Sequence, residues 1–281
     1  MKNTNYIAIP LTYLTLMLAF SCEEVVIINL PETERKIVIE GLLTDEFKSH
    51  YIRVSQVMDF YESGAFPVVT DAEVFVTTDE GEMFRYIYNP TGEILYAGYY
   101  FSEQEYAGKP GISYSMKVLL GGIEFTAIDS MVGVTSIDSL GTRINEDEKA
   151  NTEFDSLYWE VLLYASEPQE VKNYYLFNFY RNGQLARDDV TDIYAFDDTA
   201  LGGSLDGLAS PVFYAKGDTA TVEIMSLTRS GYIYYFDLVN ILNNDSGFFS
   251  PPPTNPRSNI SEGAVGIWQV SAVSRKKLVI K

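Results

Sequence analysis

The stretch that decides the fold reads Ala72-Glu73-Val74-Phe75-Val76-Thr77-Thr78, then Asp79-Glu80-Gly81-Glu82, then Met83-Phe84-Arg85-Tyr86-Ile87-Tyr88. Apolar and polar residues alternate along the first segment, as they do in a strand with one buried face. The acidic, glycine-containing segment in the middle is a turn signal, and the last segment is again rich in strand-forming residues. The stretch therefore predicts a β-hairpin.

Similar short segments lie on both sides of this hairpin and are separated by glycine, proline and asparagine. They occupy residues 36–43, 51–57, 94–101, 114–120 and 123–127. Short strands at this spacing, with turns between them, are typical of a β-sandwich. We therefore predict a mainly β protein in which residues 36–135 form an immunoglobulin-like β-sandwich.

Residues 136–156 are polar and acidic, so we expect a domain boundary or an exposed loop there. Alternating and aromatic segments resume after this point and predict further strands. One segment differs, because apolar side chains recur at the spacing of a helix face from Tyr232 to Leu242 and others lie off this stripe. We therefore predict a second β-rich domain over residues 136–281, with one buried helix near residues 228–243.

The N-terminus has the features of a secretory signal peptide. Lys2 precedes an apolar run that is too short to cross a hydrocarbon core of roughly 30 Å as a helix. The end of this run, Leu18-Ala19-Phe20-Ser21-Cys22, resembles a bacterial lipobox, which implies cleavage before Cys22 and attachment of fatty acids such as palmitate to that residue. We therefore expect a signal peptide over residues 1–21 and a lipidated linker over residues 22–35.

Cys22 is the only cysteine of the chain, and the alternative is an ordinary small residue after a hydrophobic helix. Two or three acyl chains form a durable anchor, since each buried CH₂ contributes about 0.8 kcal/mol. The expected location is the cell outer membrane. Glu23 and Glu24 resemble the signal with which Bacteroidetes export lipoproteins to the cell surface, but they also suit the polar start of a linker. The periplasmic and surface faces therefore both stay open.

Composition narrows the classes of function. The formal net charge of −19 repels phosphates, which excludes a nucleic-acid partner. His50 is the only histidine, which argues against histidine-based triads and histidine-rich zinc sites. The sequence also lacks a Gly-x-Ser-x-Gly elbow with a histidine to serve it. We therefore predict a protein that is not an enzyme and assign no catalytic residue.

A cell-surface glycan hydrolase with paired carboxylates is the alternative. The presence of carboxylate pairs in the sequence neither supports nor excludes this hydrolase, because such pairs arise by chance among 39 acidic residues. No cofactor is expected, although an acidic loop offers oxygen ligands of the kind that calcium takes. The loop contains Asp188, Asp189 and Asp192 together with the metal candidates Asp197, Asp198 and Asp206. Its spacing does not match an EF-hand, and a solvated loop is the other interpretation.

Two aromatic groups are candidates for contacting a ligand or a partner protein. They are Tyr99-Tyr100-Phe101 and Phe248-Phe249, both of which we place in loops. Tyrosine and phenylalanine rings stack on sugar faces and are enriched at protein interfaces. Burial in the core is the alternative for either group.

The order of these features resembles the Bacteroidetes lipoproteins grouped as the domain-of-unknown-function 4249 family. The resembling stretches are residues 37–45, 71–76 before the Asp79-Glu80-Gly81 turn, 108–114, the aromatic strand before Asn182-Gly183, 226–235, and 258–260 before 263–268. Each stretch is short and turn-like, and their order behind the lipobox carries the resemblance. The resemblance implies an outer-membrane lipoprotein associated with a TonB-dependent transporter, and it implies no catalytic residues.

Overall fold

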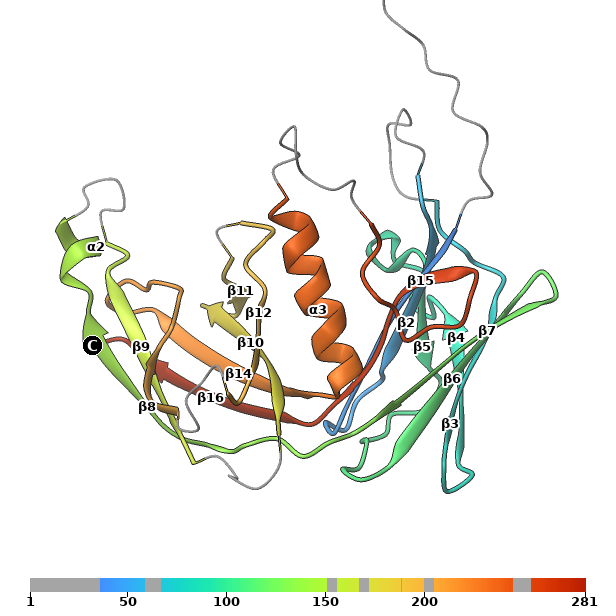
Figure 1. Ribbon diagram of the computed structural model, residues 1–281, viewed down its shortest axis with the longest axis horizontal. Coiled ribbons are helices and arrows are strands. Elements are labelled where there is room, and N and C mark those ends of the chain that lie inside the picture. The colour runs from blue at the N-terminus through green and yellow to red at the C-terminus, as the bar shows by residue number, and fades with distance from the viewer. Residues whose placement is uncertain are drawn as a thin grey trace, which may run out of the picture. The chain divides into compact units, whose positions relative to one another are not determined.

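The computed structural model describes residues 36–58, 67–150, 156–166, 172–187, 189–199, 205–244 and 254–281. In these residues the chain is mainly β, as predicted, and its strands form three sheets (Figure 1). The predicted hairpin is confirmed, since β3 (Glu73–Thr78) pairs antiparallel with β4 (Met83–Tyr88) and Val74 lies opposite Tyr86.

The largest sheet has eight strands in the order β15-β1-β2-β5-β4-β3-β6-β7. The remaining bounds are β1 Ile37–Thr44, β2 Tyr51–Gln56, β5 Tyr99–Ser102, β6 Ser113–Leu120, β7 Ile123–Ser130 and β15 Ala264–Ser271. Neighbouring strands are antiparallel except β1 and β15, which are parallel. Strand β15, from the C-terminal part of the chain, therefore joins a sheet whose other strands all come from the N-terminal part.

The eight-stranded sheet curves so that its two edge strands approach each other. Ala127 of β7 bridges Ile260, which precedes β15, and Val132 bridges Ser271 at the end of β15. Asn259 fastens this segment to β15, because its Nδ2 donates to Trp268 O at 2.7 Å and its Oδ1 accepts from Trp268 N at 3.0 Å. The sheet thus encloses an apolar core in a sandwich-like arrangement.

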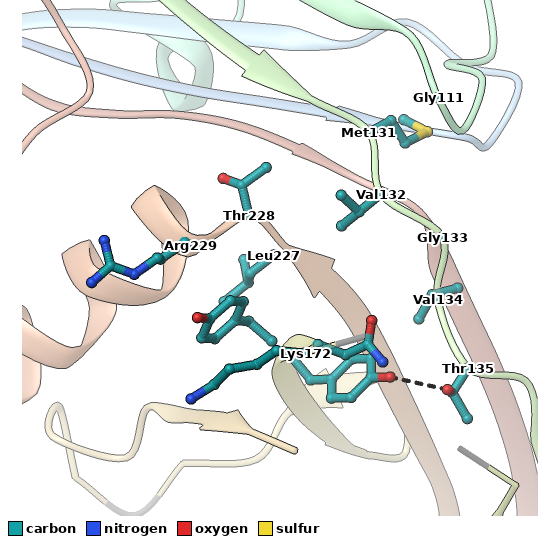
Figure 2. A pocket seen from close by; sticks show the side chains of 13 residues that line it. Gly111, Met131, Val132, Gly133, Val134, Thr135, Lys172, Leu227, Thr228 and Arg229 are labelled. Atoms are coloured by element: carbon teal, nitrogen blue, oxygen red, sulfur yellow. Dashed lines mark hydrogen bonds between the residues drawn. The ribbon is translucent and has the colours of Figure 1, made fainter. Parts of the chain in front are cut away.

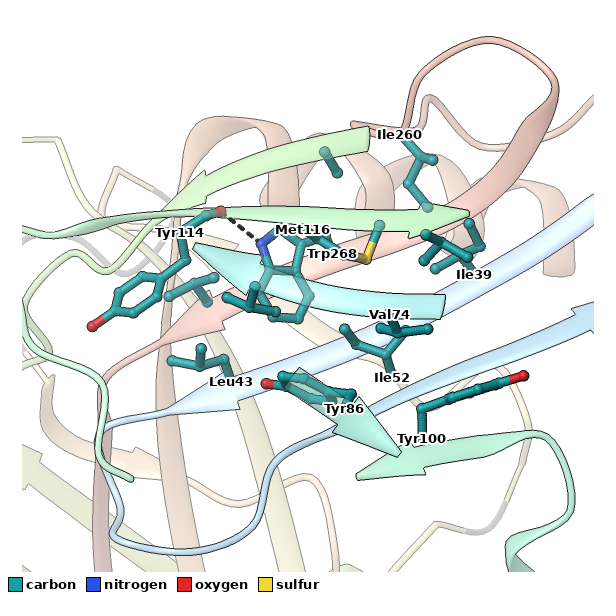
Figure 3. Close-up of a cluster of buried hydrophobic side chains, with 14 of the residues drawn as sticks. Ile39, Leu43, Ile52, Val74, Tyr86, Tyr100, Tyr114, Met116, Ile260 and Trp268 are labelled. Atoms are coloured by element: carbon teal, nitrogen blue, oxygen red, sulfur yellow. Dashed lines mark hydrogen bonds between the residues drawn. The ribbon is translucent and has the colours of Figure 1, made fainter. Parts of the chain in front are cut away.

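Trp268 lies at the centre of this core and is fully buried (Figure 3). Its ring packs where Gly41 of β1 leaves room, since a Cβ at Gly41 would meet the ring at 2.5 Å. Its Nε1 donates to Tyr114 O at 2.9 Å, so the indole N–H is satisfied inside the core. Inward-facing residues of the other strands surround the ring, including Ile39, Leu43, Ile52, Val74, Val76, Met116 and Val118.

Two smaller sheets follow. One has the order β11-β10-β14-β16, with β12 also paired to β10, and the other has the order β13-β9-β8. The bounds are β8 Ile137–Ile144, β9 Trp159–Ala165, β10 Tyr174–Arg181, β11 Gln184–Leu185, β12 Tyr194–Asp197, β13 Leu205–Ala209, β14 Thr219–Leu227 and β16 Val273–Val279. They share a second core that contains Phe177, Tyr214, Val222 and Ile224.

Strands β1 to β7 belong to the eight-stranded sheet, and β8 is the first strand of the smaller sheets. This division along the chain lies close to the predicted boundary at residue 135. Strand β15 crosses that division, because it comes from the C-terminal part of the chain and joins the first sheet. The two-domain division itself stays a prediction. The expected loop at residues 136–156 contains strand β8 and the short helix α2 (Glu146–Ala150) instead. Only Ile137 of β8 is buried, so this edge strand lacks the alternation that would reveal it.

Helix α3 (Arg229–Leu242) confirms the predicted helix. Thr228 caps its N-terminus by accepting a hydrogen bond from Gly231 N. Figure 1 shows α3 between β10 and β14 on one side and β15 on the other. Tyr232 stacks on Tyr174 of β10 at 4.9 Å, and Tyr235 donates to Gln269 Oε1 of β15 at 2.6 Å. The helix therefore packs on two sides, as its broad apolar distribution indicates, although most of its side chains are only partly buried.

Candidate functional site

The three aromatic candidates Tyr99, Tyr100 and Phe101 lie on strand β5, which directs their side chains to two opposite faces. Successive strand residues point to opposite faces, so Tyr100 points into the core and is 1% exposed. Its hydroxyl donates to Val69 O at 3.1 Å and accepts from Ala72 N at 3.0 Å. Tyr100 is therefore a core residue, whereas Tyr99 and Phe101 lie half-buried on the outer face.

Tyr99 and Phe101 belong to a larger group of rings on that outer face. Tyr96, from the short 3₁₀ helix η1 (Ile94–Tyr96), packs edge-on against Phe101 at 5.3 Å and Tyr99 at 6.0 Å. Tyr51 of β2 contacts Tyr99 at 5.3 Å. Arg53 places its guanidinium 5.6 Å from the Tyr99 ring centre. The outer face of β2 and β5 thus carries a contiguous aromatic cluster with one cation on it.

Two exposed aliphatic side chains directly precede Tyr96 of this cluster in the chain. Ile94 is 93% exposed and Leu95 is 74% exposed, and both lie directly beside Tyr96 in the chain. We define the β5 aromatic surface as Tyr51, Ile94, Leu95, Tyr96, Tyr99 and Phe101. Exposed aliphatic side chains close to partly exposed aromatic rings are typical of an interaction site. The predicted strand at residues 94–101 begins only at Tyr99, so the sequence pattern missed the turn that exposes Ile94 and Leu95.

A cavity of about 620 Å³ lies between the β7–β8 connection and strands β10 and β14 (Figure 2). Met131, Val132, Val134 and Leu227 give it apolar walls, together with the rings of two tyrosines. This volume falls in the range of small-molecule sites, and such sites have mostly apolar walls with few polar groups.

Two basic side chains, Lys172 and Arg229, are among the residues that line the cavity, and within the part of the chain that the structure describes its lining contains no Asp or Glu. Lys172 Nζ lies 2.9 Å from a carboxylate oxygen of Asp197, and this contact raises the pKa of Lys172. The cavity therefore combines apolar walls with two basic side chains, of which Lys172 is paired with Asp197. Among its described lining residues there is no pair of carboxylates of the kind that glycan hydrolysis uses.

The acidic candidates do not converge. Asp197 ends β12 and pairs with Lys172, and Asp198 accepts from Asn173 N at 2.9 Å. Asp206 lies in β13 of a different sheet. Among the residues that the structure describes, no group of three or more His, Cys, Asp or Glu residues is arranged to hold a metal ion. Asp188 lies outside the described residues.

Cys22, Phe248 and Phe249 also lie outside the described residues. Within the part of the chain that is described, none of the helices has the length and apolar character needed to cross a bilayer.

A buried carboxylate, Asp129, joins the end of β7 to β15 and α3. Its Oδ2 accepts from Val270 N at 2.9 Å, and its Oδ1 accepts from the Thr228 hydroxyl at 2.6 Å. Burial raises the pKa of Asp129 to about 6, against the opposing effect of these hydrogen bonds. Thr228 lines the cavity, so this carboxylate fixes one wall of it.

We expect Asp129→Asn to alter the pH dependence of stability. An aspartate with a raised pKa favours folding below about pH 4, and this contribution is lost as pH rises through about 6. A shift of this size corresponds to about 2–3 kcal/mol. Asn does not titrate, and it keeps both partners only with one bond reversed: its Oδ1 accepts from Val270 N, and its Nδ2 donates to the Thr228 hydroxyl oxygen. Relative to the variant, the natural protein should therefore lose about 2–3 kcal/mol between pH 4 and pH 7.

Urea unfolding at several pH values measures this difference. The comparison between the two proteins is essential because His50 acts in the opposite direction. Burial lowers the pKa of His50 to about 4, so its contribution to stability grows as pH rises through the same window. Parallel pH profiles for the natural protein and Asp129→Asn would contradict the prediction.

Together, the fold and these sites define a class: a mainly β protein with a partly exposed aromatic surface and a separate cavity lined by two basic side chains. The sequence model of a family described as a domain of unknown function (DUF4249) matches residues 23–277, and the chain belongs to this family. A comparison with curated proteins gives no significant match.

Proposed function

We propose that the protein is a non-enzymatic binding or accessory lipoprotein of the outer membrane that works beside a TonB-dependent nutrient transporter. The observation that carries this proposal is the β5 aromatic surface, where Ile94 and Leu95 project into solvent beside packed aromatic rings. The lipobox-like segment ending at Cys22 and membership of the family support it from the sequence.

The chemistry of the β5 aromatic surface suits a protein partner. Covering an exposed Ile or Leu side chain contributes about 1.5–3 kcal/mol. Tyrosine and arginine are the residue types that most often dominate binding energy at interfaces. Arg53 is held in place by Glu40, whose carboxylate lies 3.2 Å from it, so the cation is positioned before a partner arrives.

A lipid anchor favours binding through such a contact, although the anchor itself contributes no atoms to the contact. Lipidation at Cys22 confines the protein to a thin layer at the membrane, which raises its effective concentration toward a membrane partner. A contact that is weak in free solution then suffices. The proposal holds for either face of the outer membrane.

The test is a pull-down of the tagged, lipidated protein from its own host, followed by mass spectrometry. We expect a transporter to be recovered with the natural protein. Ile94→Asp combined with Leu95→Asp should reduce recovery about tenfold or more, because losing 1.4 kcal/mol already gives a tenfold change. The matched control is Ile123→Asp, since Ile123 is 60% exposed at the start of β7, on another strand. It should leave recovery unchanged.

A parallel Cys22→Ser variant tests the anchor, and its lipid-dependent mass and its membrane fractionation should both disappear. Equal recovery of the transporter with and without the aspartates would refute the role of the β5 aromatic surface. Recovery of no transporter, together with turnover of a glycan, would favour the glycan hydrolase instead.

A further inference from the structure

We propose that the cavity between the β7–β8 connection and strands β10 and β14 binds a small amphipathic organic anion, with an apolar body and one anionic head group. This site is distinct from the β5 aromatic surface, because it is lined by different elements. The inference does not depend on the proposed function.

The walls of the cavity fit the apolar body. Met131, Leu227 and Tyr175 are almost completely buried, and they form walls that neither move readily nor offer free hydrogen-bonding groups. Val132 and Val134 add further apolar surface from the β7–β8 connection. A cavity of about 620 Å³ has room for a ligand with a phenyl ring or a short alkyl chain.

Three hydroxyl groups in the cavity walls, those of Thr135, Tyr175 and Thr228, already have partners within the protein. The hydroxyls of Thr135 and Tyr175 lie 3.0 Å apart and bond to each other (Figure 2). The Thr228 hydroxyl donates to Asp129. A ligand body inserted between these walls therefore needs no polar atoms of its own there, and burying polar atoms without partners would cost free energy.

The head group fits the two cations. Lys172 and Arg229 extend to the same side of the view in Figure 2, away from Thr135. Lys172 has three N–H donors and uses Asp197 as one partner, which leaves donors for a ligand. The guanidinium of Arg229 is exposed, and its planar array of donors matches a carboxylate.

The charge of the rest of the protein makes this arrangement selective. The chain carries a net charge of −19, so its surface generally repels anions. The cavity departs from this average, because its described lining contains two cations and no carboxylate, and Asp197 offsets the charge of only one of them, Lys172. A neutral ligand gains only from the walls, and a cation meets like charge. An amphipathic anion alone gains from both features.

The test compares 3-phenylpropionate with 3-phenylpropanamide, which has the same shape and no charge. The full mature lipidated protein is placed in phosphatidylcholine nanodiscs, and binding is followed by saturation-transfer NMR titration with empty nanodiscs as the blank. We expect the carboxylate to bind with a Kd of about 1 mM or tighter, which is reasonable for a ligand of this size. The amide should bind about tenfold more weakly.

Variants then locate the site. Arg229→Gln should weaken binding of the carboxylate about tenfold and leave the amide unchanged. Arg85→Gln is the matched control, because Arg85 is an exposed arginine on β4 of the first sheet. It should leave both ligands unchanged. Val132→Trp should fill the cavity and abolish binding of both, provided that its circular dichroism spectrum shows an intact fold.

Three outcomes would overturn the proposal: no binding of the carboxylate, equal binding of carboxylate and amide, or the same loss with Arg85→Gln as with Arg229→Gln. The arginine comparison stays decisive even if Val132→Trp does not fold.

Discussion

Trp268→Ala is expected to lower the free energy of unfolding by about 3–5 kcal/mol. The ring is fully buried and fills the centre of the eight-stranded sheet. Its removal would leave a cavity next to Gly41, which has no side chain to fill it. It would also leave Tyr114 O without the indole donor that lies 2.9 Å away. The loss therefore combines a packing defect with an unsatisfied carbonyl.

Urea unfolding followed by far-ultraviolet circular dichroism measures this loss. Tryptophan fluorescence is unsuitable, because the substitution removes one of only two tryptophans in the chain. Trp268→Phe serves as the control, since it restores most of the volume without the N–H donor and should cost clearly less. A loss below about 1 kcal/mol for Trp268→Ala would show that the ring is not the centre of the core, because surface substitutions typically fall in that range.

Local sequence patterns were sufficient to predict most individual strands. Segments such as 51–57 and 72–78 alternate because one face meets the core and the other meets solvent. The helix at Arg229–Leu242 was equally predictable from its 3.6-residue period. The predictions failed where burial does not follow either period, as in β8, which exposes side chains on both faces.

Long-range pairing could not be predicted in the same way. Strand β15 pairs in parallel with β1, although Ile39 and its partner Gly266 lie far apart in the sequence. No turn connects the two strands directly, so no local signal specifies their register. Fold-level pairing of this kind depends on the complete sheet and on the segment around Asn259 that fastens β15.

For the candidate sites too, some residues could be predicted from the sequence and others could not. The aromatic residues of β5 were found by composition. The strand predicted at 94–101 includes them, and their second interpretation as a loop was wrong, because strand alternation sends Tyr100 into the core and Tyr99 and Phe101 outward. The basic residues of the cavity were missed. Lys172 and Arg229 are isolated in sequence, and only the packing of α3 beside β10 brings them to one cavity.

Gly266→Ala is the second substitution for which we expect a loss of about 3–5 kcal/mol, from backbone strain and overpacking together. Gly266 has φ +116°, and a Cβ built there would lie 2.0 Å from Ile39 O of β1. The obstructing atom is a backbone oxygen in a paired strand. It cannot turn away as a flexible side chain could, so relief requires β1 and β15 to separate.

The matched control is Gly81→Ala in the turn between β3 and β4. Gly81 has a similar φ of +91°, but a Cβ there would meet nothing within 4 Å. The control therefore isolates the cost of the positive φ, which is about 1–2 kcal/mol, and any further loss in Gly266→Ala comes from the contact with β1. Because Trp268 follows two residues later on β15, weakening this pairing also loosens the core around its ring. Equal losses in the two variants, measured by urea unfolding, would show that the close approach of β15 to β1 contributes nothing to stability.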